Sequence, residues 1–105
     1  DLFGFHRALV EGRLLKPETV KAATSVQIVE AELPEVTYAY GYGFEVQKRG
    51  TVRMVGHAGG MEGVSARYEY YPDLDVLVVA LSNYDTSAVI FASHMRDILA
   101  AQASR

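Results

Sequence analysis

The first third of the chain shows helical spacing that is interrupted by turn residues. Apolar residues over 1–11 recur at helical intervals and Gly12 follows them, so this range predicts a short amphipathic helix. Pro17 suits the first position of a second short helix, which we expect to reach about Thr24. Residues 25–37 show no clear period, and we expect a surface loop there.

Four stretches in the middle of the chain have the pattern of β-strands. Aromatic residues alternate with small ones over 38–47, and a turn at 48–50 leads into a second strand at 51–56. Residues 64–71 alternate between two faces, and residues 76–81 are apolar throughout. A continuous apolar run is typical of a strand that is buried on both faces.

The chain closes with a predicted helix from Asp85 or Thr86 to about Ala101, with an apolar stripe on one side. The stripe comprises Ala88, Phe91, Ala92, Met95, Ile98 and Leu99, and Arg96 lies off it. The predicted fold class is α+β: an antiparallel four-stranded meander packed with N-terminal and C-terminal helices.

The strand at 76–81 raises a question about this meander. It is the most hydrophobic strand, yet it falls last and would lie at an edge of the sheet. Either the strand order is not sequential, or a missing segment or another subunit pairs with it, and we favour the missing segment.

Composition narrows the class of protein. The 105 residues are 50% hydrophobic and 22% charged, which indicates a folded chain of one domain or less. A net charge of −3 without a basic cluster argues against a nucleic-acid partner, and no apolar run is long enough to span a membrane. There are no cysteines, so the compartment is left open. The chain opens at Asp1 without an initiator methionine, and we expect it to be a piece of a longer protein.

The glycine-rich stretch from Val55 to Gly63 is the main candidate for function. It follows a predicted strand and contains His57, so it is either a binding or catalytic edge or a plain hairpin in which the ring bonds a carbonyl. His6 and His94 fall in helices, where a structural role is expected. One histidine beside one acid does not make a metal site, and we predict neither a metal nor a cofactor. The glycines lead into a strand rather than a helix, which argues against a phosphate loop.

A serine nucleophile is not evident in the chain. The six serines are at positions 25, 65, 82, 87, 93 and 104, and none has a lysine three residues further on. Ser65 is expected to face solvent beside Arg67. The sequence therefore contains no complete catalytic apparatus.

Several segments together resemble the C-terminal part of the serine β-lactamase-like superfamily. They are Tyr40-Gly41-Tyr42-Gly43-Phe44, the His57-Ala58-Gly59-Gly60 box, the strand 64–71, the run from Tyr71-Pro72 to Ser82-Asn83, and the opening residues 1–24. The nearest branch holds class C β-lactamases, esterases, D-aminopeptidases and DD-peptidases.

The resemblance implies roles for four residues. Members of the family use a Ser-x-x-Lys motif, a Tyr-x-Asn motif and a Lys/His-x-Gly box, and only the last is present here. By this likeness His57 and Gly60 are catalytic: His57 lines the pocket beside the nucleophile, and the N–H of Gly60 stabilises an oxyanion. Gly59 and Met61 would contact the substrate. A histidine in place of lysine is more typical of the esterases and peptidases.

The resemblance also implies a place for the chain in a larger protein. Residues 1–105 would form a single C-terminal subdomain of a serine hydrolase that acts on a small-molecule or peptide ester, amide or β-lactam, and would be inactive alone. The alternative is a non-catalytic module that pairs a peptide or another subunit with its sheet edge. In either case the strand 76–81 could support a homo-oligomer.

Overall fold

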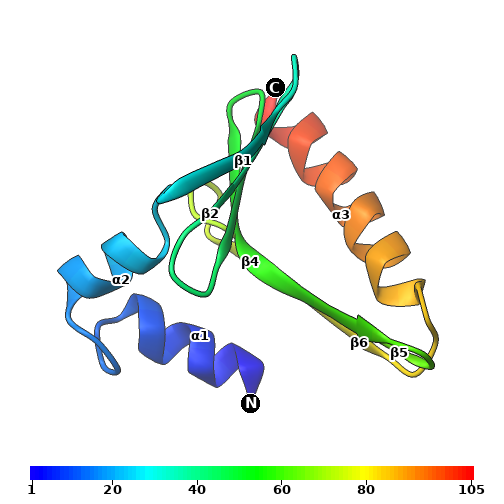
Figure 1. The fold of residues 1–105 in the computed structure, drawn as a ribbon, viewed down its shortest axis with the longest axis horizontal. Coiled ribbons are helices and arrows are strands. Elements are labelled where there is room, and N and C mark those ends of the chain that lie inside the picture. Colours follow the sequence, from blue (N-terminus) through cyan, green and yellow to red (C-terminus); the bar gives the residue numbers. More distant parts are fainter.

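The computed structural model describes residues 1–105 as three helices and one six-stranded sheet (Figure 1). In chain order the elements are α1 (Leu2–Val10), α2 (Pro17–Ala23), β1 (Ile28–Glu32), β2 (Val36–Tyr40), β3 (Glu45–Arg49), β4 (Val52–Met61), β5 (Val64–Tyr71), β6 (Val76–Ser82) and α3 (Ser87–Ala103). The strands lie in sequence order and each is antiparallel to its neighbour. The α+β class is confirmed, whereas the predicted number of four strands is wrong.

Two local features account for the difference in strand number. β1 lies where a loop was expected, and all five of its residues are exposed, so it has no buried face to produce a period. The stretch 38–47 is two strands, because a turn at 41–44 separates β2 from β3. Within this turn the N–H of Gly41 donates to the carbonyl of Phe44 at 2.7 Å.

The turn at 41–44 is fixed to the end of α2. The N–H of Tyr42 donates to the carbonyl of Ala23 at 2.9 Å, and a Cβ on Gly41 would lie 2.1 Å from the same oxygen. Only glycine allows the two backbones to come this close. The glycine that looked like part of a strand is therefore a docking point between the sheet and α2.

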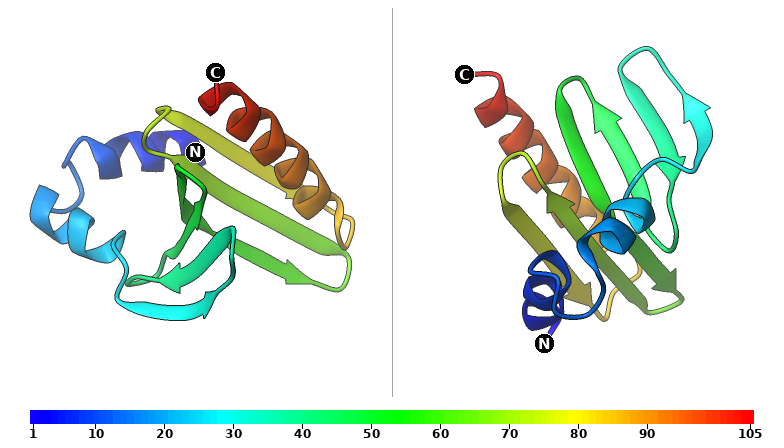
Figure 2. Two further views of the ribbon diagram at one scale, coloured as in Figure 1. Left: turned by 90° about the horizontal axis from the view of Figure 1, so that it is seen from above. Right: turned by 90° about the vertical axis from the view of Figure 1, so that its left-hand side faces the viewer.

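The helices occupy both sides of the sheet. Figures 1 and 2 show α1 and α2 on one side and α3 along the other. Successive side chains of a strand point to opposite faces of the sheet, so one strand can contact helices on both sides. On β5, Tyr68 bonds His6 of α1, whereas Glu69 bonds Arg96 of α3. None of the three helices has the length and apolar character that crossing a bilayer requires.

The main core lies between the sheet and α3. Its fully buried members are Met54, Tyr71, Val78 and Leu99. α3 begins and ends within two residues of the prediction, but its buried side differs from the expected stripe. Phe91 and Ile98 are half exposed, whereas Arg96, expected off the stripe, bonds the buried Glu69. A buried carboxylate attracts the arginine of the helix toward the sheet, which apolar periodicity cannot predict.

β6 lies at an edge of the sheet, with β5 as its single neighbour. The sequential order answers one part of the question raised by the sequence, because a non-sequential arrangement is excluded. Val78 is the one residue of β6 that is fully buried, and Leu81 is 69% exposed. That a missing segment or a second copy pairs with this edge stays a prediction.

Candidate functional site

The candidate site lies on the second half of β4. This strand takes part in two hairpins: residues 52–56 pair with β3, and residues 55–61 pair with β5. The glycine-rich stretch, expected as a loop, is continuous strand up to Met61, and the turn is confined to Glu62 and Gly63. β3 begins opposite Gly56, so residues 57–61 have a strand partner on one side only.

The open edge carries two backbone N–H groups. Two-residue turns close both hairpins of β4, and the two residues that flank such a turn form a hydrogen-bonded pair. From that pair onward, the backbone N–H groups of successive residues point alternately toward the partner strand and away from it. Counting from either turn, the N–H groups of Gly56, Ala58 and Gly60 point to the side of β3. Beyond Gly56 there is no strand on that side, so the N–H groups of Ala58 and Gly60 are available to a ligand.

The glycines of this stretch serve different purposes. A Cβ on the buried Gly56 would lie 1.9 Å from the carbonyl oxygen of Tyr68, so close strand approach requires glycine there. A Cβ on Gly59 would meet nothing within 4 Å, and one on Gly60 would meet only the oxygen of Val64 at 3.7 Å. Neither of these two glycines has a positive φ. Packing within the chain therefore does not require glycine at 59 or 60, and both positions leave the edge unobstructed.

His57 is exposed, and both of its ring nitrogens are engaged. Nδ1 lies 2.6 Å from the carbonyl oxygen of Ala58, which can only accept, so Nδ1 carries a proton. Nε2 lies 3.0 Å from the hydroxyl of Tyr40, and in the neutral ring it accepts a hydrogen bond from that hydroxyl. The two rings meet edge to face, with centroids 5.8 Å apart. Tyr40 thus fixes the orientation of His57 from the end of β2.

Sequence reasoning missed two residues at this site. Tyr40 was counted among the alternating aromatic residues of a predicted strand, but the turn after it brings its hydroxyl to His57, which is 17 positions away in sequence. Asp85 was considered only as a helix cap, whereas its Oδ1 accepts the N–H of Gly63 at the hairpin tip. Both contacts join separate elements, so no local pattern could indicate them. Met61, next to that tip, is 74% exposed.

The other two histidines belong to α1 and α3. His6 is buried, its Nδ1 lies 2.6 Å from the hydroxyl of Tyr68, and burial lowers the pKa of the imidazole below its ordinary value. His94 is exposed on α3. No group of three or more metal-ligating side chains gathers anywhere in the chain.

The serines of the chain are not arranged as nucleophiles. Ser65 is buried on the α3 face, opposite His57, where it donates to the carbonyl of Tyr84 and accepts the N–H of Ala88. The expectation that it faces solvent is wrong, because this pair of bonds joins β5 to the start of α3. No serine hydroxyl bonds a histidine or a lysine.

A charged network lies behind the strands that form the site. The carboxylate of Glu69 is fully buried and accepts bonds from Arg67 at 2.5 Å, Arg96 at 2.6 Å and Tyr71 at 2.5 Å. Burial alone raises the pKa of Glu69, but the bonds from the tyrosine and the two arginines outweigh it and hold the pKa below its ordinary value. Burial and the bonded carboxylate both raise the pKa of Tyr71. β4 changes direction between its two halves (Figure 1), and we place this bend at Gly56, where the strand passes from β3 to β5. Because Glu69 is the partner of Gly56 in the sheet, the network stabilises β5 directly behind the bend.

Comparisons with known proteins identify the fold. No protein-family model and no curated protein sequence matches the chain. Among solved structures it is similar to a penicillin binding protein from Bacillus halodurans, with a TM-score of 0.79 and 19% sequence identity. The match covers 92% of this chain and 29% of that protein. The chain therefore has the fold of one part of a penicillin-binding protein, and it spans less than a third of the length of that protein.

Proposed function

We propose that this chain supplies one wall of the acyl-transfer site of a serine hydrolase of the penicillin-binding-protein and β-lactamase type. The observation that carries the proposal is the open edge of β4. There a histidine, two sterically unnecessary glycines and an unpaired backbone N–H lie together on a fold similar to that of a penicillin binding protein. The nucleophile would come from outside these 105 residues, since every serine here lacks a base.

In this proposal Gly60 and His57 have the catalytic roles. A serine oxygen attacks the carbonyl carbon of an ester, amide or β-lactam, and the negative charge moves to the carbonyl oxygen. The N–H of Gly60 donates to that oxyanion, and a second donor would accompany the serine. Expulsion of the leaving group gives an acyl-enzyme, which water hydrolyses. His57 accepts a hydrogen bond from the hydroxyl of Tyr40, and in this proposal it holds that hydroxyl at the edge of the pocket.

Gly59 and Met61 would contact the substrate on the same edge. Gly59 has open space where a side chain would stand, so the backbone can be approached closely. The exposed side chain of Met61 is apolar and flexible, and it suits contact with a variable substrate group.

The test compares the 105-residue chain with the same chain extended by its upstream coding sequence. We expect the 105 residues alone neither to turn over a chromogenic cephalosporin or p-nitrophenyl ester nor to react with a covalent serine probe. The extended chain should do both if it includes a Ser-x-x-Lys motif in frame. Labelling of the 105-residue chain would disprove that the nucleophile lies outside it.

Two variants of the extended chain test the role of Gly60. Gly60→Pro removes the N–H at a position where the sheet does not use it, and kcat should fall by about 10²- to 10³-fold. Gly60→Ala retains the N–H and serves as the matched control. Equal activity of the two variants would show that the N–H of Gly60 is not an oxyanion donor.

A second candidate function rests on two of the free edges of the sheet. β6 lacks an outer neighbour and exposes Leu81, and the second half of β4 is open, so the chain could be a module that adds a peptide strand or a second copy. An independent start codon near Asp1 would support this function. Sedimentation should then show a dimer at high concentration, and a monomer would count against it.

A further inference from the structure

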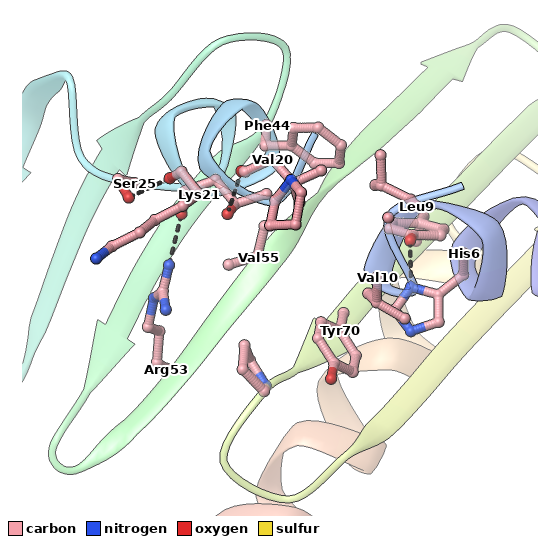
Figure 3. Close-up of a pocket in the computed structure, with 15 residues that line it drawn as sticks. His6, Leu9, Val10, Val20, Lys21, Ser25, Phe44, Arg53, Val55 and Tyr70 are labelled. Atoms are coloured by element: carbon pink, nitrogen blue, oxygen red, sulfur yellow. Dashed lines mark hydrogen bonds between the residues drawn. The ribbon is translucent and has the colours of Figure 1, made fainter. Parts of the chain in front are cut away.

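A pocket of about 350 Å³ lies between α1, α2 and the face of the sheet opposite α3 (Figure 3). Its apolar walls come from both helices and the sheet, and they include Leu9, Val20, Phe44 and Val55. Neither His57 nor the glycines at 59 and 60 line it, although Tyr68, which does, is the strand partner of His57. Its volume falls within the range of small-molecule sites.

The charged groups of the pocket are all positive. None of its 15 lining residues is an aspartate or a glutamate, although the chain as a whole has a net charge of −3. Arg53 and Lys21 line one end. Arg53 donates one bond, from Nη2 to the carbonyl of Thr24 at 2.6 Å, which leaves most of the five guanidinium donors uncommitted. The pocket therefore favours an anion at this end.

A buried donor lies at the other end of the pocket. His6 is 4% exposed, and the phenol of Tyr68, the stronger acid of the pair, donates to its Nδ1. Burial raises the pKa of Tyr68 to about 12, so the phenol keeps its proton, and Nε2 of His6 then carries the ring proton. No residue of the chain accepts a hydrogen bond from Nε2. Nε2 is not fully enclosed, because Nε of Arg96 is the one completely buried side-chain nitrogen or oxygen that lacks a partner, so an acceptor oxygen of a ligand in the pocket can reach this free N–H.

The hydroxyl groups of the pocket are already engaged. Tyr68 donates to His6, Tyr70 donates to Asp75 at 3.1 Å, and the hydroxyls of Thr24 and Ser25 donate to carbonyls of α2. The hydroxyl protons are therefore committed, and the side-chain donors that stay free include those of Arg53 and His6, at two ends of an apolar cavity. Figure 3 shows Arg53 and His6 at these opposite ends.

We propose that this pocket binds a small apolar carboxylate that carries a second acceptor oxygen at its far end. The carboxylate would accept from Arg53 and attract Lys21, the apolar body would lie against Val20 and Val55, and the distal oxygen would accept the N–H of His6. This ligand site does not depend on the proposed hydrolase function, because it shares no residue with the open edge of β4.

The test uses 3-(4-acetylphenyl)propanoate, whose carboxylate and ketone oxygens stand at opposite ends of a benzene ring. Calorimetry on the 105-residue chain should give saturable binding with a Kd on the order of 1 mM or tighter. Amide resonances that shift in NMR should cluster at 6–12, 20–25 and 53–55. The corresponding propanamide should bind at least about tenfold more weakly, and the 4-isopropyl analogue about threefold more weakly.

Charge variants with matched controls locate the anion. Arg53→Gln and Lys21→Gln should each weaken binding by about three- to tenfold, whereas Arg49→Gln and Lys48→Gln, outside the pocket, should leave it unchanged. Lys21 is exposed and bonds nothing through its side chain, so its variant tests the charge without a risk to folding. Val10→Trp, at the pocket wall, should abolish binding while the spectrum stays folded.

Three results would overturn the proposal. One is equal binding of the propanoate and the propanamide, which would show that charge is not recognised. Another is binding that Lys21→Gln and Val10→Trp both leave unchanged. The third is a set of NMR shifts centred on the exposed apolar residues Leu81 and Phe91, which would indicate nonspecific association with the open surfaces.

Discussion

The two halves of β4 differ in almost every respect although they form one continuous strand. In the first half Met54 and Val55 are each 3% exposed, and the strand pairs with β3. In the second half residues 57 and 59–61 are exposed, and the side that faced β3 is open. The change falls at Gly56, opposite the first residue of β3. The comparison shows how a single strand serves stability up to its bend and presents an open edge beyond it.

The largest expected effect comes from the network behind the bend. Glu69→Ala leaves Arg67 and Arg96 without their carboxylate in a buried site, and the free energy of unfolding should fall by about 3–5 kcal/mol. Chemical denaturation measures this change. Glu62→Ala, at the exposed hairpin tip, is the control and should change stability by less than about 0.5 kcal/mol.

The same carboxylate predicts how stability depends on pH. Because the pKa of Glu69 is lower in the folded chain than its ordinary value of 4.5, the unfolded state binds the proton more readily. This contribution is fully present above pH 4.5 and is lost as the pH falls through the folded pKa. Denaturation at several pH values should show this loss in the wild type and a flatter profile in Glu69→Ala.

Gly56→Ala tests whether the bend itself requires glycine. The added Cβ would lie 1.9 Å from the oxygen of Tyr68, which is backbone and cannot rotate away. We expect a loss of about 3 kcal/mol or more in the free energy of unfolding. An unchanged midpoint in urea would show that the strands can separate at this point and that the bend is not fixed by steric contact.

His57 is one residue beyond the bend, and we expect His57→Ala to have a small effect on the free energy of unfolding. The exposed ring bonds only Tyr40 and its own neighbouring carbonyl, so stability should change by less than about 1 kcal/mol. The aromatic NMR resonances of Tyr40 should shift, whereas those of Tyr68 should not. A loss as large as that of Gly56→Ala would contradict the division of β4 into two halves.

Gly59→Ala should have the smallest effect of the series. Nothing lies within 4 Å of the added methyl group, and stability should change by no more than about 0.5 kcal/mol. Together, Gly59→Ala and Gly56→Ala compare how the same substitution changes stability at two glycines of one strand. In the extended chain the same variant should weaken substrate binding, since its methyl group would stand in the proposed approach path.

The sequence by itself located most helices and strands and the box for which we propose a chemical role. Apolar periodicity predicted α1 and α3, Pro17 predicted α2, and the patterns of 51–56, 64–71 and 76–81 predicted β4, β5 and β6. The glycines around His57 indicated an accessible edge. The sequence could not predict β1, because an exposed strand has no period. The sequence also predicted one strand where the structure has β2 and β3, because alternating aromatic and small residues are compatible with both a strand and a glycine turn.

Only the tertiary structure determined which segments distant in sequence contact one another. The turn at 41–44 docks on α2, and β3 begins directly after it, opposite Gly56. The edge of β4 is therefore open beyond Gly56, which local sequence could not show. Nor could it show that Tyr40 orients His57, that Glu69 bonds two arginines, or that Arg53 and His6 line one pocket. The sequence specifies local propensity and chemistry, whereas contacts between distant residues depend on register and on the approach of backbones, which form only in the folded chain.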